Sequence, residues 1–315
     1  MKSTTAHKDI ELLIENIERV IVGKHDAVCL AVASLLSGGH LLLEDKPGTG
    51  KTVLAKTLAR SIQCDFKRIQ CTPDLLPIDI TGYVDPRTGE FKRGPVFAQI
   101  LLADELNRAT PRTQSALLEA MAEGQVSVDG KSHPLAPPFM VIATQNPIEH
   151  RGVNDLPEAQ LDRFQMVLSL GYPGKPEEER ILVERMRDDP LSGVQPVLEA
   201  RRVLELIAEA ARVTIDRRIV QYILYIADGT RISPDLALGV STRAALQLMS
   251  LSRAYALIQR RDFVTPDDVK LLAPLCFAHR IIPRQYQGDP SGRFSSQQKI
   301  IKALVDKIVM LKVEL

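Results

Sequence analysis

Residues His40–Ile62 read HLLLEDKPGTGKTVLAKTLARSI, and this stretch decides the fold. The apolar run Leu41–Leu43 predicts a buried strand of a parallel sheet. The breaker residues of Lys46–Gly50 predict a tight loop. From Lys51 onward, apolar residues recur at helical spacing. A strand, a glycine loop, a Gly-Lys-Thr triplet and a helix, in this order, predict a phosphate-binding loop.

This loop has a defined chemistry. We expect the backbone N–H groups of Gly48–Thr52 to surround a β-phosphate at the N-terminus of the following helix. Lys51 is then placed to reach the β- and γ-phosphates, and the hydroxyl of Thr52 is placed to bind Mg²⁺.

The loop departs from the usual G-x-x-x-x-G-K-[ST] pattern at one position, because Asp45 stands where the pattern has glycine. We expect this position to need an unusual backbone angle rather than a missing side chain. Aspartate tolerates the left-handed region better than most residues do. The prediction of a phosphate-binding loop therefore stands despite Asp45.

A second strand that ends in acidic residues follows about fifty residues later. The segment Gln99–Glu105 reads QILLADE, and open α/β sheets bind ligands at the carboxyl ends of their strands. Asp104 suits outer-sphere contact with Mg²⁺, and Glu105 suits a general base that polarises water for in-line attack. A strand that merely ends in surface acids is the alternative, and its position after a phosphate-binding loop disfavours it.

A third strand carries a polar residue at its end. Pro138–Pro147 reads PFMVIATQNP. Asn146 either has a functional role, in which it orients the attacking water or touches the γ-phosphate, or is a turn asparagine before proline. Its place beyond Asp104 and Glu105 favours the first interpretation.

Two stretches within this region lack the pattern of the core. Residues 76–94 contain hairpin turn residues at Asp85–Phe91 and predict an insertion with a small hairpin or loop. Loops of this length inside a domain are usually functional. Residues 124–137 alternate in polarity and then turn, which predicts a β-hairpin.

The breaker-rich Gly171–Pro176 marks a linker, so we expect one domain over residues 1–172 and a second over 173–315. The pattern beyond the linker is helical, without a strand signal. The expected helices are Glu177–Arg187, Leu198–Ala211, Arg218–Ala227, Thr242–Arg260, Pro266–Ala278 and Ser296–Val313.

Two further segments have competing interpretations. Val22-Gly23 either lies against a nucleotide base or marks a plain helix boundary. Arg243, at the start of a long helix, either points back at a nucleotide between the domains or is an exposed first-turn arginine, which the helix dipole mildly disfavours.

The composition bounds the function. The 315 residues carry a net charge of +1, which gives no global electrostatic case for nucleic acid or membrane. No run approaches the roughly 20 apolar residues of a membrane-spanning helix, and the histidines show no metal-binding spacing. Four scattered cysteines suit reduced thiols, so we expect a cytoplasmic protein.

Taken together, these stretches resemble the MoxR family of AAA+ ATPases over almost the whole chain, from Val22 to the C-terminal helices. The resemblance implies an α/β fold, with a P-loop AAA+ αβα core on a parallel sheet and a smaller all-α lid domain. It also removes the concern over Asp45, because an acidic residue before the loop is common in this family. The segments that carry it are LEDKPGTGKT (43–52), LLADELNRATP (101–111), QSALLEAMAE (114–123), ATQNP (143–147) and LPEAQLDRF (156–164).

The resemblance also implies roles for individual residues. Asp104 and Glu105 look like the Walker B pair, Asn146 resembles sensor 1, Arg163 resembles an arginine finger that acts on a neighbour's nucleotide, and Arg243 resembles sensor 2. Arg108 and Arg151 are rival fingers. The segments 76–94 and 124–137 resemble the helix-2 insertion and the hairpin before sensor 1. The implied contacts with ATP and Mg²⁺ are Val22, Gly23, Pro47, Gly48, Thr49, Gly50, Lys51, Thr52, Val53 and Asp104.

The leading functional prediction is an ATP-driven, chaperone-like remodeller of protein clients. The family suggests a homo-hexameric ring, often with partners that contain a von Willebrand factor A domain. The first alternative is the motor subunit of a metal-insertion complex such as magnesium chelatase. The second is a nucleic-acid motor, which needs a basic pore loop, but the insertion has balanced charges: Arg87, Lys92 and Arg93 against Asp79, Asp85 and Glu90.

Overall fold

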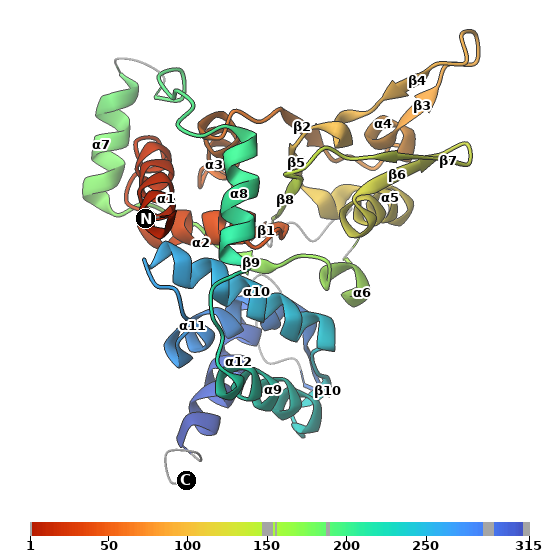
Figure 1. Cartoon of the computed structure of the whole chain (residues 1–315). Coiled ribbons are helices and arrows are strands. Elements are labelled where there is room, and N and C mark those ends of the chain that lie inside the picture. Colours follow the sequence, from red (N-terminus) through yellow and green to blue (C-terminus); the bar gives the residue numbers. More distant parts are fainter. Residues whose placement is uncertain (1, 147–153, 155, 187–189, 286–292, 311–315) are drawn as a thin grey trace.

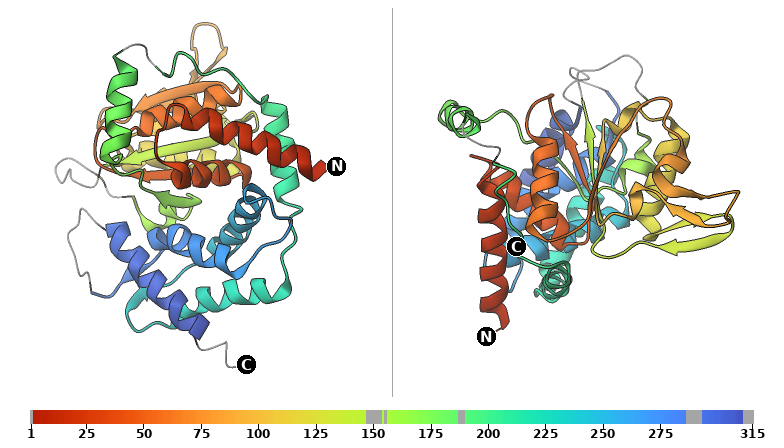
Figure 2. Two further views of the ribbon diagram at one scale, coloured as in Figure 1. Left: turned by 90° about the vertical axis from the view of Figure 1, so that its left-hand side faces the viewer. Right: turned by 90° about the horizontal axis from the view of Figure 1, so that it is seen from above.

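The computed structural model describes residues 2–146, 154, 156–186, 190–285 and 293–310. A central sheet is covered by helices on both faces, and a helical region lies against one end of it (Figure 1). Two hairpins project from the side of the sheet that is opposite α1, as the view from above shows (Figure 2). Within the described residues, none of the helices combines the length and the hydropathy needed to cross a membrane.

The central sheet is parallel throughout, with the strand order β2-β5-β8-β1-β9. Leu41 lies opposite Ile142 on one side and Met166 on the other, so the strand before the phosphate-binding loop is interior to the sheet. This confirms the predicted parallel sheet. The strands are β1 (Leu41–Glu44), β2 (Phe66–Gln70), β5 (Ile100–Asp104), β8 (Met140–Gln145) and β9 (Met166–Leu168).

Alternate residues of each strand enter two different hydrophobic cores, because successive side chains of a strand point to opposite faces. Leu41 and Leu43 pack in the larger core with α1 (Lys2–Glu18), α2 (His25–Leu36) and α3 (Lys51–Ser61). Leu42 packs in the smaller core on the other face, with α5 (Pro111–Glu123). The continuous apolar run in the sequence therefore reflects burial on both faces.

The two predicted hairpins are present on the outer side of this core. The insertion contains the hairpin β3 (Gly82–Val84) and β4 (Phe91–Arg93), and the second hairpin consists of β6 (Gln125–Val128) and β7 (Lys131–Pro134). The insertion also contains α4 (Pro77–Thr81), which we did not predict. A helix of five residues is too short to show a periodic pattern, and its start is set locally by the Asp79 carboxylate, which accepts the N–H of Leu76 at 2.8 Å.

The C-terminal region confirms a helical lid with one departure. The chain forms a short antiparallel ribbon of β10 (Leu236–Leu238) and β11 (Ile282–Pro283), where we expected no strand. Strands of two and three residues are too short for alternation to be visible. The helices are α7 (Lys175–Arg185), α8 (Ala200–Ala210), α9 (Arg217–Ile232), α10 (Thr242–Ile258), α11 (Pro266–Phe277) and α12 (Arg293–Met310).

The core and the lid share one hydrophobic cluster, to which α2 contributes from the core and α8 and α10 from beyond the linker. Backbone N–H groups of Val197 and Leu198 donate to the carbonyl of Ser61, and Arg202 pairs with Asp9 at 2.7 Å. The domain boundary after residue 172 stays a prediction. The structure adds that α8, beyond this boundary, lies against the core.

Candidate functional site

The phosphate-binding loop is shaped by two glycines with left-handed backbone angles. Gly48 has φ of +81° and Gly50 has φ of +93°, and a side chain at either position would meet no atom within 4 Å. The requirement for glycine here is therefore conformational. Because α3 begins at Lys51, directly after Gly50, the loop leads into a helix N-terminus with unpaired N–H groups, as an anion site needs.

The Lys51 ammonium lies folded back on its own loop. It donates to the carbonyl oxygens of Asp45 at 2.6 Å and Lys46 at 2.9 Å. Burial lowers the pKa of this ammonium, while the negative charges of Asp45, Asp104 and Glu105 act in the opposite direction. The two acids that end β5 are thus within electrostatic reach of the loop lysine.

Asp45 corrects one of our expectations. Its backbone is not among those with positive φ in the described residues, so it does not replace glycine for a left-handed angle. Its buried carboxylate is an acceptor instead: Oδ1 accepts the N–H of Lys46, while Oδ2 accepts the N–H of Gly171 at 2.7 Å and the hydroxyl of Ser169 at 3.2 Å. Asp45 therefore ties the loop to the segment that follows β9.

Asp104 and Glu105 lie at the carboxyl end of β5, beside β8. Thr144 of β8 joins them: its hydroxyl donates to Oδ1 of Asp104 at 2.6 Å and accepts the N–H of Glu105 at 2.8 Å. Glu105 has φ of +56°, a rare angle for a residue with a side chain. Such strain is typical of sites where the direction of a side chain matters.

Arginine and glutamine side chains that we did not predict in this role hold these two carboxylates. Arg68 of β2 donates to Oδ2 of Asp104 at 2.7 and 3.1 Å. Gln70 donates to Oε2 of Glu105 at 2.8 Å, and Arg108 donates to the same oxygen at 3.0 Å. The register pairs Gln70 with Asp104 across the sheet. The spacing in the sequence shows only that Arg68 and Gln70 share a face of β2. It is the pairing of β2 with β5 that brings this face next to Asp104 and Glu105.

Asn146 is buried and follows β8 directly. The N–H of Asp45 donates to the carbonyl of Gln145 at 3.3 Å, so Asn146 comes next to the start of the phosphate-binding loop. Its position agrees with the predicted contact with phosphate or water, which stays a prediction.

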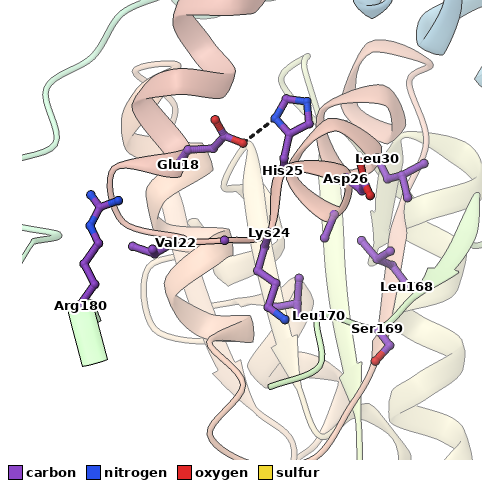
Figure 3. Close-up of a pocket in the computed structure, with 12 residues that line it drawn as sticks. Glu18, Val22, Lys24, His25, Asp26, Leu30, Leu168, Ser169, Leu170 and Arg180 are labelled. Atoms are coloured by element: carbon purple, nitrogen blue, oxygen red, sulfur yellow. Dashed lines mark hydrogen bonds and ion pairs between the residues drawn. The ribbon is translucent and has the colours of Figure 1, made fainter. Parts of the chain in front are cut away.

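Val22 and Gly23 line a pocket of about 680 Å³ beside the loop (Figure 3). The far wall comes from Leu168 and Leu170, at the end of β9. Gly23 has φ of +71°, and a Cβ there would lie 2.4 Å from Cγ of Glu177 on α7. Since β9 pairs with β1, and Asp45 contacts the segment after β9, the pocket adjoins the loop. The lining is mixed, because the charged side chains of Glu18, Lys24, Asp26 and Arg180 lie beside the apolar residues (Figure 3). The contact of Val22 and Gly23 with a nucleotide base stays a prediction.

The oxygen ligands that Mg²⁺ prefers are available between the loop and β5. Thr52 offers a hydroxyl in the first turn of α3, and Asp104 offers a carboxylate that already accepts two side-chain donors. The donor set is one of hard oxygens, and it fits magnesium that is held mainly by phosphates, with few protein ligands.

The arginines that resemble a finger and sensor 2 lie elsewhere. Arg163 precedes β9, and its Nη1 donates to the carbonyl of Leu118 on α5 at 2.7 Å. Arg243 lies in the first turn of α10, exposed, with its charge within electrostatic reach of His40, the residue before β1. Both arginines thus belong to the end of the sheet where β1 and β9 begin.

The phosphate-binding loop lies at the other end of the sheet, where β1 and β9 finish. That Arg243 contacts a nucleotide stays a prediction, and the structure places this residue at the opposite end of the sheet from the loop of its own chain. The reason is that the lid docks on α2 and on the start of β9. Of the rival fingers, Arg108 pairs with Glu105, and Arg151 lies outside the described residues.

Comparisons with known proteins support the same architecture. The sequence model described as ATPase family associated with various cellular activities (AAA) matches residues 40–166, and that of the AAA lid domain matches residues 228–303. A solved structure from Cytophaga hutchinsonii superimposes with a TM-score of 0.87 at 37% identity, covering 97% of this chain and 96% of that one. An MCM homologue from Methanopyrus kandleri, with a TM-score of 0.58 at 20% identity, shares the fold, covering 85% of this chain and 60% of its own.

Curated relatives cover most of the chain as well. The protein YeaC of Bacillus subtilis is 49% identical over 85% of this chain and 85% of its own length. The chaperone MoxR1 of Mycobacterium tuberculosis is 43% identical over 87% of this chain and 75% of its own length. The protein MoxR of Paracoccus denitrificans is 30% identical over 83% of this chain and 85% of its own length. With the phosphate-binding loop, the paired acids of β5 and the helical lid in place, the chain belongs to the MoxR family of AAA+ ATPases.

Proposed function

We propose that this protein hydrolyses ATP and uses the energy to remodel or mature protein clients. In this proposal, Pro47–Val53 bind the phosphates, the pocket of Val22 and Gly23 takes the base, and Lys51 exchanges its loop carbonyls for phosphate oxygens. Glu105 polarises the attacking water, and Asn146 orients it. The predicted cytoplasmic location is unchanged by the structure.

Magnesium would be held by Thr52 and, through water, by Asp104, where it would neutralise charge on the transferring phosphoryl group. The carboxylate of Asp104 is fixed for this task by Thr144 and Arg68. Gln70 and Arg108 both donate to Oε2 of Glu105, so in this proposal the other carboxylate oxygen, Oε1, polarises the water.

The observation that carries the proposal is the separation of the arginines from the loop. Arg163 and Arg243 belong to one end of the sheet, whereas the loop, Asp104 and Glu105 belong to the other. A second subunit that presents its arginine end to this loop completes the site. An arginine supplied in this way is worth about 10³–10⁵ in rate in related chemistry. We therefore propose a homo-oligomeric ring, a hexamer, in which both arginines act on a neighbour.

The client surface that we propose is formed by the insertion. Leu76, Ile78 and Tyr83 are about half exposed there, which is unusual for side chains of this size in one short segment. The chaperone name of the Mycobacterium tuberculosis relative favours protein clients over nucleic acid or a metal chelatase. A partner with a von Willebrand factor A domain belongs to the same proposal.

The test is the ATPase rate per subunit against protein concentration, for wild type and for mixtures with Arg163→Ala. We expect a rate per subunit that rises steeply with concentration, because each Arg163 serves a neighbour's site, and a loss that exceeds the mutant fraction, because one incomplete site interrupts the coupled cycle of the whole ring. A rate per subunit that stays constant over all concentrations, together with a proportionate loss, would mean that each subunit works alone, and the ring proposal would be wrong. Arg112→Ala, on α5, is the matched arginine control.

Client action needs a separate measurement. Glu105→Gln keeps the shape of the side chain but removes the base, so turnover and client maturation should both stop while ATP still binds. If maturation continued without turnover, nucleotide would act only as a binding switch.

A further inference from the structure

The segment Asp162–Gln165, which carries Arg163, is fixed to the lid of its own chain. The guanidinium of Arg280, next to α11, reaches the carboxylate of Asp162 with Nε at 2.7 Å and the Asp162 carbonyl with Nη2 at 3.2 Å. The same guanidinium donates to the carbonyls of Phe164 and Gln165. One lid side chain thus binds three of the four residues in this segment.

The ion pair between Arg280 and Asp162 is buried, so it favours this one arrangement of the segment and the lid. The Arg280 side chain is 2% exposed, and the carboxylate of Asp162 is its ion-pair partner. Separating a buried guanidinium from its carboxylate strongly destabilises the folded protein, because the charge is left uncompensated. The segment and the lid therefore remain together while both are folded. His279 adds a bond from its ring Nε2 to the carbonyl of Phe164 at 3.1 Å, and Gln165 donates to the carbonyl of Gln247 on α10 at 2.9 Å.

Asp162 also contacts the N-terminus of α10. The hydroxyl of Ser241, which caps this helix by accepting the N–H of Ala244, lies 3.3 and 3.4 Å from the two carboxylate oxygens of Asp162. A carboxylate is favoured at a helix N-terminus by the helix dipole. Asp162 therefore bridges Arg280 and the turn of α10 that contains Arg243, and it is the residue directly before Arg163.

We propose that Asp162 is a positioning residue through which the lid of one subunit sets Arg163 against the nucleotide of the next subunit. This inference rests on the proposed action of Arg163 across subunits. Asp162 does not touch the nucleotide of its own chain, because it lies at the opposite end of β9 from that loop, and its carboxylate is directed to Arg280 and Ser241 of the lid. A shift of the lid then moves Arg163 and Arg243 together, so the lid of each subunit controls hydrolysis in its neighbour.

The test uses the full chain and the variant Asp162→Asn, with Asp267→Asn as matched control. Asp267→Asn is the same chemical change at another position of the lid. The side chain of Asp267 is 89% exposed, and its ion-pair partner is Lys270. We expect Asp162→Asn to lower the single-turnover hydrolysis rate at least ~10-fold, since misplacing a catalytic group by about 1 Å can cost 10²-fold. Its nucleotide affinity should stay within about twofold of wild type, because the loop is untouched.

A second pair of variants tests the contact from the lid side. Ser241→Asp and Ser241→Asn both keep a good helix cap, but only the first places a carboxylate against that of Asp162. We expect Ser241→Asp to slow hydrolysis about as much as Asp162→Asn, and Ser241→Asn to stay near the wild-type rate. A folding defect would affect nucleotide affinity in these variants, and a positioning defect would not.

The decisive comparison places Asp162→Asn in a background that carries both Arg163→Ala and Arg243→Ala. Without the two arginines there is nothing left to position, so the further change should alter the residual rate by less than about twofold. An equal loss in both backgrounds, a loss of nucleotide affinity, or an unchanged rate in Asp162→Asn alone would overturn the inference. If Arg163→Ala itself had no effect on turnover, the proposed action across subunits would be wrong, which is a separate result.

Discussion

At the scale of single residues, Asp45 is the departure from the usual loop pattern, and its carboxylate gives a direct test of why it is there. Asp45→Gly restores the common motif, yet it removes the acceptor for the N–H of Gly171 and the hydroxyl of Ser169. We expect this variant to bind nucleotide roughly 10-fold more weakly, since hydrogen bonds to charged groups contribute about 1.5–3 kcal/mol. Titration with a fluorescent ATP analogue measures the change.

Asp45→Asn is the control for that experiment, because its amide oxygen still accepts one of the two bonds. Its affinity should lie between those of wild type and Asp45→Gly. If Asp45→Gly bound nucleotide as tightly as wild type, the aspartate would merely be tolerated in place of glycine, and the anchoring role would be wrong.

A second residue gives a prediction about pH. The ring of buried His40 accepts the N–H of Val141 at Nδ1 (3.0 Å) and meets the carbonyl of Met121 at Nε2 (3.2 Å), which requires the neutral form. Burial lowers the pKa of His40 to about 4, and the charge of Arg243 adds to this. The unfolded chain therefore takes up the proton first as the pH falls.

Because the pKa is lower in the folded state, His40 costs no stability above pH 6.5 and destabilises progressively between pH 6.5 and about 4. The full loss is up to about 3 kcal/mol. Urea unfolding of wild type and His40→Gln across this range measures it. The variant should lose less free energy of unfolding than wild type does over the same interval. Burial also lowers the pKa of His279, so the free energy of unfolding of the variant should still decrease somewhat as the pH falls. Equal slopes in both proteins would contradict the assignment.

At the scale of elements, the two projecting hairpins are joined by an aromatic contact. The rings of Phe91 on β4 and His133 on β7 stack with centroids 4.0 Å apart, and Phe91 also meets Phe97 edge-on at 5.6 Å. Such pairs contribute about 0.5–1.5 kcal/mol beyond the buried area. The hairpins should therefore respond to changes as one unit.

Phe91 belongs to the β3–β4 hairpin, but Phe91→Ala should also loosen the β6–β7 hairpin. We expect backbone amides of β6 and β7 to exchange hydrogen roughly 2- to 10-fold faster, which is the stacking energy converted to an opening equilibrium. Exchange followed by mass spectrometry measures this. Tyr83→Ala removes an exposed ring from β3 and is the control. Faster exchange confined to β3 and β4 would mean that the hairpins are independent.

The elements also show where sequence reasoning succeeds. The strands before the loop, before Asp104 and before Asn146 were predictable, because each is an apolar run bounded by breakers or polar residues. The ribbon of β10 and β11 was not, because two or three residues show no alternation. Arg68 and Gln70 were missed for a different reason: their role comes from pairing of β2 with β5, and no local pattern encodes that register.

At the scale of the whole molecule, the place where the lid docks decides which nucleotide Arg243 can reach. The helix that begins at Thr242 was predicted correctly, and so was the arginine in its first turn. The end of the sheet against which this helix docks depends on contacts with α2 and with Asp162, which are remote in sequence. Arg243 consequently lies at the end of the sheet that is remote from its own loop, and in the proposed ring it would meet the loop of a neighbour.

The same docking predicts that the core does not stand alone. All ten residues from Ala27 to Leu36 of α2 are buried, and the lid helix α10 packs with them in one cluster. A chain that ends at residue 172 exposes this face, and each large apolar side chain left in water costs about 1.5–3 kcal/mol. We expect the fragment to aggregate or to lose cooperative unfolding, whereas full-length protein melts in one transition. A fragment that unfolds cooperatively as a monomer in calorimetry would show instead that the lid is an independent unit, free to move without disturbing the core.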